Sequence, residues 1–191
     1  MKKNIISSSI SLLLGASLSG IAQAEISPYL QTVTEQSIWV NWISDTEQSP
    51  AVRFGADSDE LTKVAVGTTE KLGDNYYYHS VQLTNLLPSQ HYYYQAYSET
   101  DSSDVARFKT LPVDGDSDTT TRVLVIGDHQ IIDDPRHQKL VAAGKAKIET
   151  QFGQPIEDVV DLMVNFGDQV HYGTLEQYKK LSALTSRQRQ A

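Results

Sequence analysis

Two short apolar runs in the last third of the chain, each closed by Gly-Asp, decide how that part folds. They read Arg122-Val-Leu-Val-Ile-Gly127-Asp128-His129-Gln130 and Asp161-Leu-Met-Val-Asn-Phe166-Gly167-Asp168-Gln169-Val170-His171-Tyr172. Neither run alternates apolar and polar residues, which is typical of strands covered on both faces in parallel α/β sheets. Each run is therefore predicted to be a buried strand with a carboxylate at its end.

A helix is predicted between the two runs. Asp134 can cap its start and Pro135 suits the first helical position, while Gly153 followed by Pro155 ends it. Its apolar positions recur at helical spacing, at Val141, Gly144, Ile148 and Phe152. The order strand, helix, strand indicates a βαβ unit.

The two acidic strand ends are predicted to lie side by side. A right-handed crossover makes the two strands parallel, and ligands of such sheets bind at the carboxyl ends of the strands. Adjacent strands are about 4.8 Å apart, so Asp128 and Asp168 could share two metal ions roughly 3.5–4 Å apart. This geometry permits a two-metal site without requiring one.

The N-terminus has the three parts of a secretory signal peptide. Lys2 and Lys3 precede an apolar stretch at residues 10–18, and Ala22-Gln23-Ala24 forms a small-residue cleavage site. A membrane-spanning helix is disfavoured because the stretch is shorter than the ~20 residues of a span and is interrupted by Ser and Gly. We expect residues 1–24 to be removed after Ala24, and the mature protein to be periplasmic or secreted.

Composition excludes several classes of function. The chain has 191 residues, a net charge of −8 and no cysteine. An acidic chain without a basic cluster lacks the electrostatic attraction that nucleic acids and anionic membranes require. Without thiols there are no disulfides and no thiolate ligands, so any metal must be held by carboxylate, imidazole, amide or phenol groups.

Residues 25–112 have the pattern of an all-β immunoglobulin-like or fibronectin III-like sandwich. Turn residues recur about every eight to twelve positions and separate short segments of strand composition. The predicted strands cover residues 37–43, 51–54, 62–66, 76–83, 91–97 and 106–110. Six or seven strands in this length indicate a sandwich, and the polar run 113–121 is interpreted as a flexible linker.

The stretch from Leu86 to Gln95 sharpens this prediction. A Leu, a Pro turn and a Tyr at the start of a strand resemble the tyrosine corner of fibronectin type III domains, in which the Tyr hydroxyl bonds back to the turn. We assign that structural role to Tyr92. The tyrosines at 76–78 and 92–94 could form an aromatic ligand surface, but packing of alternate tyrosines against the core is favoured because aromatic residues suit strands.

Together these parts resemble the purple acid phosphatases and their calcineurin-like metallophosphoesterase relatives. In that superfamily a first motif, Asp-x-His or a variant, and a second motif, Gly-Asp-x-x, contribute ligands to a two-metal centre. By this resemblance Asp128 and Gln130 would bind one metal ion and Asp168 would bridge two. The resemblance implies two divalent or trivalent ions, Fe, Zn or Mn.

The second motif departs from the family pattern in one position. Purple acid phosphatases read Gly-Asp-x-x-Tyr with a metal-binding Tyr, whereas His171 takes that place here and Tyr172 follows it. Tyr172 is retained as a candidate metal ligand. His129 and His171 are candidate catalytic residues, as a phosphate contact or a proton donor, because His titrates near neutral pH. The alternative for both is a surface histidine beside a metal loop.

Residues 122–191 are expected to be only the first part of a metallophosphoesterase domain. Two strands with apolar faces and one or two helices cannot cover each other. A final helix, capped by Thr174, is expected to have nothing to pack against its stripe of Leu175, Tyr178, Leu181 and Leu184. The C-terminal part of the domain, with an Asn-His block and further histidines, is expected to be missing, in a fragment or a prematurely terminated product.

The predicted function is hydrolysis of a small phosphate ester by two-metal activation of water, with this chain carrying the first two metal motifs. No nucleic-acid partner is expected, and no membrane partner after signal cleavage. The chain alone is expected to bind metal weakly and to have negligible turnover. The alternative is a non-catalytic exported binding or adhesion module with relic metal motifs.

Overall fold

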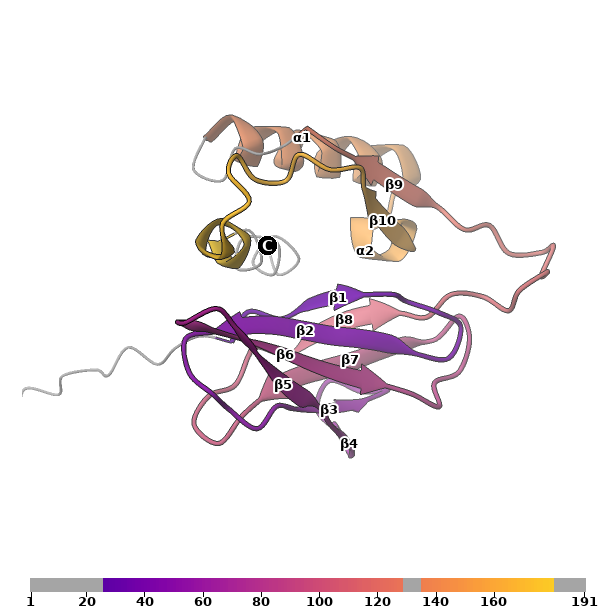
Figure 1. The fold of residues 1–191 in the computed structure, drawn as a ribbon. Helices are drawn as coiled ribbons and strands as arrows, with labels where there is room; N and C mark the ends of the chain where they lie inside the picture. Colours follow the sequence, from indigo (N-terminus) through magenta and orange to yellow (C-terminus); the bar gives the residue numbers. More distant parts are fainter. Residues whose placement is uncertain (1–25, 129–134, 181–191) are drawn as a thin grey trace, which may run out of the picture.

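The computed structural model describes residues 26–128 and 135–180, and its larger part is a β-sandwich (Figure 1). The sandwich strands are β1 (Tyr29–Gln31), β2 (Ile38–Ser44), β3 (Ala51–Gly55), β4 (Lys63–Val66), β5 (Thr68–Leu72), β6 (Tyr76–Leu83), β7 (His91–Tyr97) and β8 (Ala106–Lys109). They form two antiparallel four-stranded sheets, in the orders β1-β2-β6-β5 and β4-β3-β7-β8. The predicted all-β first half is confirmed. The predicted signal peptide lies outside the described residues.

Alternate side chains of the central strands fill the space between the two sheets. The buried set includes Ile38, Val40 and Trp42 of β2, Val81 and Leu83 of β6, and Tyr92, Tyr94 and Ala96 of β7. Phe108 of β8 packs beside two of these tyrosines, with ring centroids 5.7 Å from Tyr92 and 5.8 Å from Tyr94. The strand alternation that favours packing over a ligand surface thus places both tyrosines in the core.

The turn before β7 is held by side-chain hydrogen bonds. The Tyr92 hydroxyl accepts a hydrogen bond from the Leu87 N–H at 2.9 Å, which is the bond expected of a tyrosine corner. Buried Thr110 holds the same turn, because its hydroxyl donates to the Leu87 carbonyl at 2.6 Å and accepts from the Gln90 N–H at 2.9 Å. The loop is therefore fixed from β7 and from the end of β8.

A polar cluster surrounds His79, a β6 residue with no exposed surface. Its Nε2 lies 2.7 Å from the Ser44 hydroxyl and its Nδ1 lies 2.9 Å from the Thr69 hydroxyl. The ring packs 5.2 Å from Trp42. The Thr69 hydroxyl also donates to the Gln48 carbonyl at 2.6 Å, and the Ser44 hydroxyl donates to the Thr46 carbonyl at 2.6 Å. Burial lowers the pKa of His79, which favours the neutral ring.

The prediction of six or seven strands is too low, because eight are present among the described residues of the sandwich. The strands missed are β1, with three residues, and β5, which reads Thr-Thr-Glu-Lys-Leu and lies at a sheet edge. Between β4 and β5 the chain changes sheets at Gly67, where a Cβ atom would lie 2.0 Å from the Ser80 carbonyl oxygen. Glycine is required at position 67 by this close approach. β5 was not predicted because its mostly polar composition lacks the pattern of a strand.

The second half contains the predicted strand-helix-strand unit. Its elements are β9 (Val123–Ile126), α1 (Pro135–Phe152), α2 (Ile156–Val159) and β10 (Leu162–Asn165). β9 and β10 pair in parallel, with Val123 opposite Leu162 and Ile126 opposite Asn165. The helix ends where predicted, at Gly153, whose φ is 68° and whose N–H donates to the Glu149 carbonyl at 2.8 Å. The proposed cap Asp134 lies outside the described residues, and α2 was not predicted.

The apolar faces of this unit are largely open. Val159 is its one fully buried apolar residue among those described, whereas Val125, Leu140 and Phe166 are 54%, 70% and 75% exposed. The expectation that the two strands and their helices cannot cover each other agrees with this exposure. No helix within the described ranges is both long and apolar enough to cross a bilayer.

The final helix corrects one expectation. Residues 175–180 are helical, and the Gln177 N–H donates to the Thr174 hydroxyl at 3.3 Å, as predicted for the cap. A Cβ atom on Gly73 would lie 3.4 Å from Leu175 Cδ1, and Lys179 lies over the Tyr76 ring at 5.1 Å. The helix therefore packs against the β5–β6 turn of the sandwich, rather than against nothing. Leu181 and Leu184 lie outside the described residues.

Candidate metal centre

The two Gly-Asp ends lie next to each other, as predicted. β9 and β10 are adjacent and parallel, and the Phe166 N–H donates to the Ile126 carbonyl at 2.9 Å, which extends the pairing to the last residue before each Gly-Asp. Asp128 and Asp168 therefore leave the same edge of the sheet at its carboxyl end. Both residues are exposed.

Both aspartates have backbone angles that are uncommon for residues other than glycine. Asp128 has a φ of 52° and Asp168 a φ of 49°, in the left-handed region. Asp is among the few side chains that tolerate this region, and such outliers cluster at functional sites. The two strand ends thus share one local conformation, in which the chain turns sharply directly at the carboxylate.

A side chain that sequence reasoning missed orders the second strand end. The Asn165 side-chain oxygen accepts a hydrogen bond from the Gly167 N–H at 3.0 Å, and Gly167 has a φ of 101°. This is an Asx turn, which Asn at the end of a strand followed by Gly favours. The order Asn165-Phe166-Gly167 carries this signal.

The carboxylates of this edge suit hard metal ions in part. Asp128 and Asp168 supply oxygen ligands, and no ion pair formed within residues 26–128 and 135–180 neutralises either of them. Those same ranges contain no group of three or more His, Asp or Glu side chains close enough to hold a metal. The described residues therefore fit a partial ligand set.

The remaining predicted site residues divide into two groups. His129 and Gln130 lie outside the described residues. His171 and Tyr172 follow Asp168 in the chain, with ring centroids 5.9 Å apart, and both are exposed. The Tyr172 N–H donates to the Gln177 side chain at 2.9 Å, which ties this loop to the final helix. The metal and catalytic roles of these four residues stay predictions.

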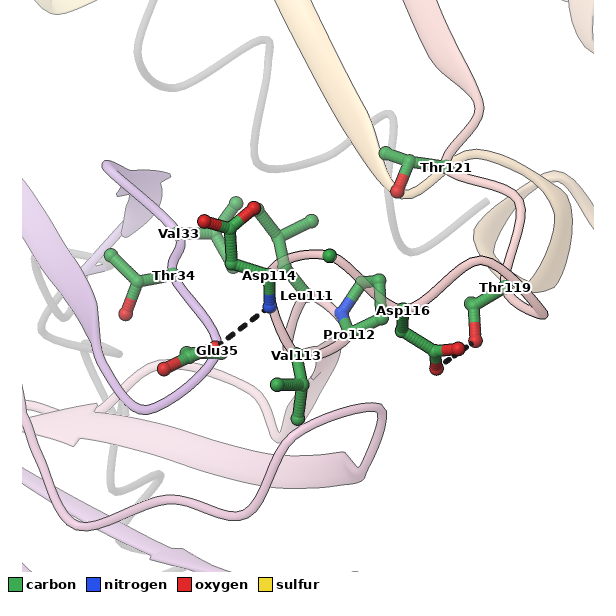
Figure 2. Close-up of a pocket in the computed structure, with 11 residues that line it drawn as sticks. Val33, Thr34, Glu35, Leu111, Pro112, Val113, Asp114, Asp116, Thr119 and Thr121 are labelled. Atoms are coloured by element: carbon green, nitrogen blue, oxygen red, sulfur yellow. Dashed lines mark hydrogen bonds between the residues drawn. The ribbon is translucent and has the colours of Figure 1, made fainter.

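A hollow of about 420 Å³ lies elsewhere, between the sandwich and the linker (Figure 2). Its lining comes from the loop before β2 and the linker before β9: Val33, Thr34, Glu35, Leu111, Pro112, Val113, Asp114, Gly115, Asp116, Thr119 and Thr121. Glu35 accepts from the Asp114 N–H at 3.2 Å, and Asp116 accepts from the Thr119 hydroxyl at 2.6 Å. That bond holds the pKa of Asp116 below its usual value. The hollow lies at the amino end of β9, away from the Gly-Asp ends.

The fold and the strand ends define a class of protein, a β-sandwich joined to a parallel strand-helix-strand unit with paired acidic ends. Residues 24–110 match the family described as purple acid phosphatase, N-terminal domain. The first half of the chain is therefore similar to the N-terminal domain of purple acid phosphatases.

One solved structure shows a related fold, and two others are less similar. A purple acid phosphatase from yellow lupin (Lupinus luteus) seeds is 19% identical with a TM-score of 0.50, and the match covers 87% of this chain and 40% of that one. PhoD is 14% identical over 85% of this chain and 35% of its own, with a TM-score of 0.49. The short sensor domain of the anti-sigma factor RsgI4 from Pseudobacteroides cellulosolvens is 18% identical, with coverages of 49% and 99% and a TM-score of 0.37. Comparison with curated proteins gives no match.

Proposed function

We propose that this chain takes part in metal-dependent hydrolysis of a phosphate ester, by holding the first ligands of a two-metal centre. The observation that carries the proposal is the pair of Gly-Asp ends on adjacent parallel strands, each with its Asp in the left-handed region. The purple acid phosphatase-like domain at residues 24–110 supports the same family of reactions. The match spans 40% of the lupin enzyme's length, so the activity of a whole phosphatase is a proposal for this chain.

Each predicted site residue has a role in this proposal. Asp168 would serve both metal ions, and Asp128 with Gln130 would hold one of them. Tyr172 would add a phenol ligand, and His129 and His171 would act as a phosphate contact or a proton donor. The metals, Fe, Zn or Mn, supply Lewis-acid activation of the ester and of the attacking water when bound. The donor types present are compatible with all three metals.

Further polypeptide completes the site in this proposal. The exposed Val125 and Phe166 of the strand pair and Leu140 of α1 support it, because apolar side chains of a parallel sheet and its helices are normally covered. The C-terminal part of a catalytic domain would cover these faces and bring the remaining ligands. We also propose that the protein acts in the periplasm or outside the cell, on the basis of the signal-peptide pattern at residues 1–24.

Calorimetric titration of the whole chain with Mn²⁺, followed by inorganic phosphate, tests the proposal. We expect weak Mn²⁺ binding that Asp128→Asn and Asp168→Asn each abolish, and phosphate binding only after Mn²⁺ is added. Asp116→Asn is the matched control, because Asp116 is an equally exposed aspartate in the linker. Turnover of an aryl phosphate by the chain alone is expected to be negligible.

Two outcomes would contradict this function. Mn²⁺ binding that survives both substitutions would place the metal elsewhere. Phosphate binding that is the same with and without metal would favour a non-catalytic binding module, in which the Gly-Asp motifs are relics.

A further inference from the structure

The sandwich and the strand-helix-strand unit meet through oppositely charged side chains. The sandwich contributes Arg107 and Lys109 of β8, whereas the facing turn around α2 contributes Asp158 and Asp161. Arg107 lies 2.8 Å from Asp158, and Lys109 lies 3.3 Å from Asp161. In Figure 1 this turn lies directly over the β8 edge of the sandwich. Two cations of one unit thus face two anions of the other.

Asp161 joins three parts of the chain at once. One carboxylate oxygen is paired with Lys109, and the other accepts a hydrogen bond from the Arg122 N–H at 2.9 Å. The Asp161 N–H donates to the Arg122 carbonyl at 3.0 Å, and its side chain is only 10% exposed. A single carboxylate therefore fastens the starts of β9 and β10 to the sandwich, at the opposite end of the strands from the Gly-Asp ends.

Asp158 sits in a second, less directional contact. Its Oδ1 lies 2.8 Å from Arg107 and 3.5 Å from His91 Nε2, yet both Oδ1 and Nε2 are buried and neither is aligned for a hydrogen bond. Glu157 adds a more distant contact to Arg107 at 3.9 Å. The attraction therefore depends on charge, and a partly buried position screens it less than a surface one.

The final helix contacts the sandwich at a second place. Lys179 of the final helix pairs with Asp45, which follows β2, and lies over the Tyr76 ring of β6. Leu175 packs against the turn at Gly73. Contacts at two separate places on the sandwich fix an orientation, whereas one contact would allow the unit to pivot.

We propose that these ion pairs form an electrostatic joint that holds the sandwich and the strand-helix-strand unit as one rigid body in solution. The linker at residues 113–121 then connects two units of fixed relative orientation and does not act as a hinge. The Asp114 N–H donates to Glu35, which holds the first part of the linker against the sandwich. The joint fixes the direction in which the Gly-Asp ends point relative to the sandwich. It does not depend on metal binding or on catalysis.

Limited proteolysis of the linker and ¹⁵N relaxation test the joint in the whole chain. We expect one rotational correlation time for both units of the wild type. Asp158→Arg should place like charges beside Arg107 and raise the rate of linker cleavage about tenfold, with separate correlation times for the two units. Arg107→Asp combined with Asp158→Arg restores opposite charges, and should return the cleavage rate to within about twofold of wild type.

A control variant changes a charge that does not face the sandwich. Glu176→Lys breaks the exposed pair with Lys180 within the final helix and should leave linker cleavage unchanged. Two correlation times in the wild type would overturn the proposal. So would linker cleavage that is as slow in Asp158→Arg as in the wild type, or a double variant that stays as sensitive as Asp158→Arg, provided that thermal unfolding shows the sandwich to be folded in each variant.

Discussion

Replacing Tyr92 by Phe removes one hydrogen bond from the turn that precedes β7 and keeps the aromatic ring in the core. The hydroxyl accepts from the Leu87 N–H at 2.9 Å, and the ring stacks on Phe108 at 5.7 Å, a contact that Phe retains. Loss of a hydrogen bond that leaves a backbone N–H without its partner costs about 1–3 kcal/mol. Leu87 is exposed, so water can replace part of the bond, and we expect a loss of about 1–2 kcal/mol in the free energy of unfolding.

Urea unfolding followed by tryptophan fluorescence measures this loss, since Trp42 lies in the same core. In thermal unfolding each kcal/mol should lower Tm by about 4–8 °C for a domain of this size. Tyr93→Phe is the control, because Tyr93 is the next residue of β7 and points to the opposite face. Because Thr110 holds the same turn, Thr110→Val combined with Tyr92→Phe should be non-additive by about 0.5 kcal/mol or more. Equal stability of Tyr92→Phe and wild type would refute the structural role of the corner.

Three further results are expected. Burial lowers the pKa of His79 in the folded state. The contribution of neutral His79 to the free energy of unfolding is therefore complete above about pH 6.5 and is lost as the pH falls through the folded-state pKa. The free energy lost is about 1.4 kcal/mol for each unit by which folding lowers the pKa. Urea unfolding at about pH 7.5 and about pH 5 should show this loss in the wild type and a smaller one in His79→Gln; equal losses would contradict it. Leu83→Ala should lower the free energy of unfolding by about 2–5 kcal/mol, because Leu83 is fully buried. Gln82→Ala, on the outer face of the same strand, should change it by no more than about 0.5 kcal/mol. Equal urea midpoints for the two variants would be inconsistent with the observed sandwich core. Asp161→Ala should destabilise the strand-helix-strand unit by about 1–3 kcal/mol more than Glu176→Ala does, because the Arg122 N–H and Lys109 both lose their partner. Hydrogen exchange of the β9 amides measures this difference. Similar exchange rates in the two variants would show that Asp161 does not hold β9 in place.

Sequence patterns predicted the elements that have strong local signals. The apolar runs before Gly127 and Gly167 predicted the parallel strands, and Pro135 with Gly153 predicted the bounds of the helix. The prediction that these strands are buried is wrong for the described residues, because Val123, Val125 and Met163 are exposed. The Pro turn before Tyr92 gave the hydrogen bond of the corner. In each case a short segment holds the whole signal, so no knowledge of distant contacts was needed.

The elements and contacts that were missed depend on tertiary structure. β1, β5 and α2 have three to five residues each, and β5 is mostly polar because it lies at a sheet edge. Arg107 and Asp158 are 51 residues apart in the chain, so only the assembled fold brings their charges together. The final helix was expected to lack a partner because its contact, the turn at Gly73, belongs to the other half of the chain.

The most direct test of the central claim is to locate a bound metal at the Gly-Asp ends. Substoichiometric Mn²⁺ broadens the NMR signals of amides close to it, and the whole chain can be titrated in this way. We predict that the amide signals of Gly127, Asp128, Gly167 and Asp168 broaden first, and that Asp168→Asn prevents this. Broadening that begins instead at Glu35, Asp114 and Asp116, or that is unchanged in Asp168→Asn, would contradict the assignment of these strand ends as the start of a metal centre.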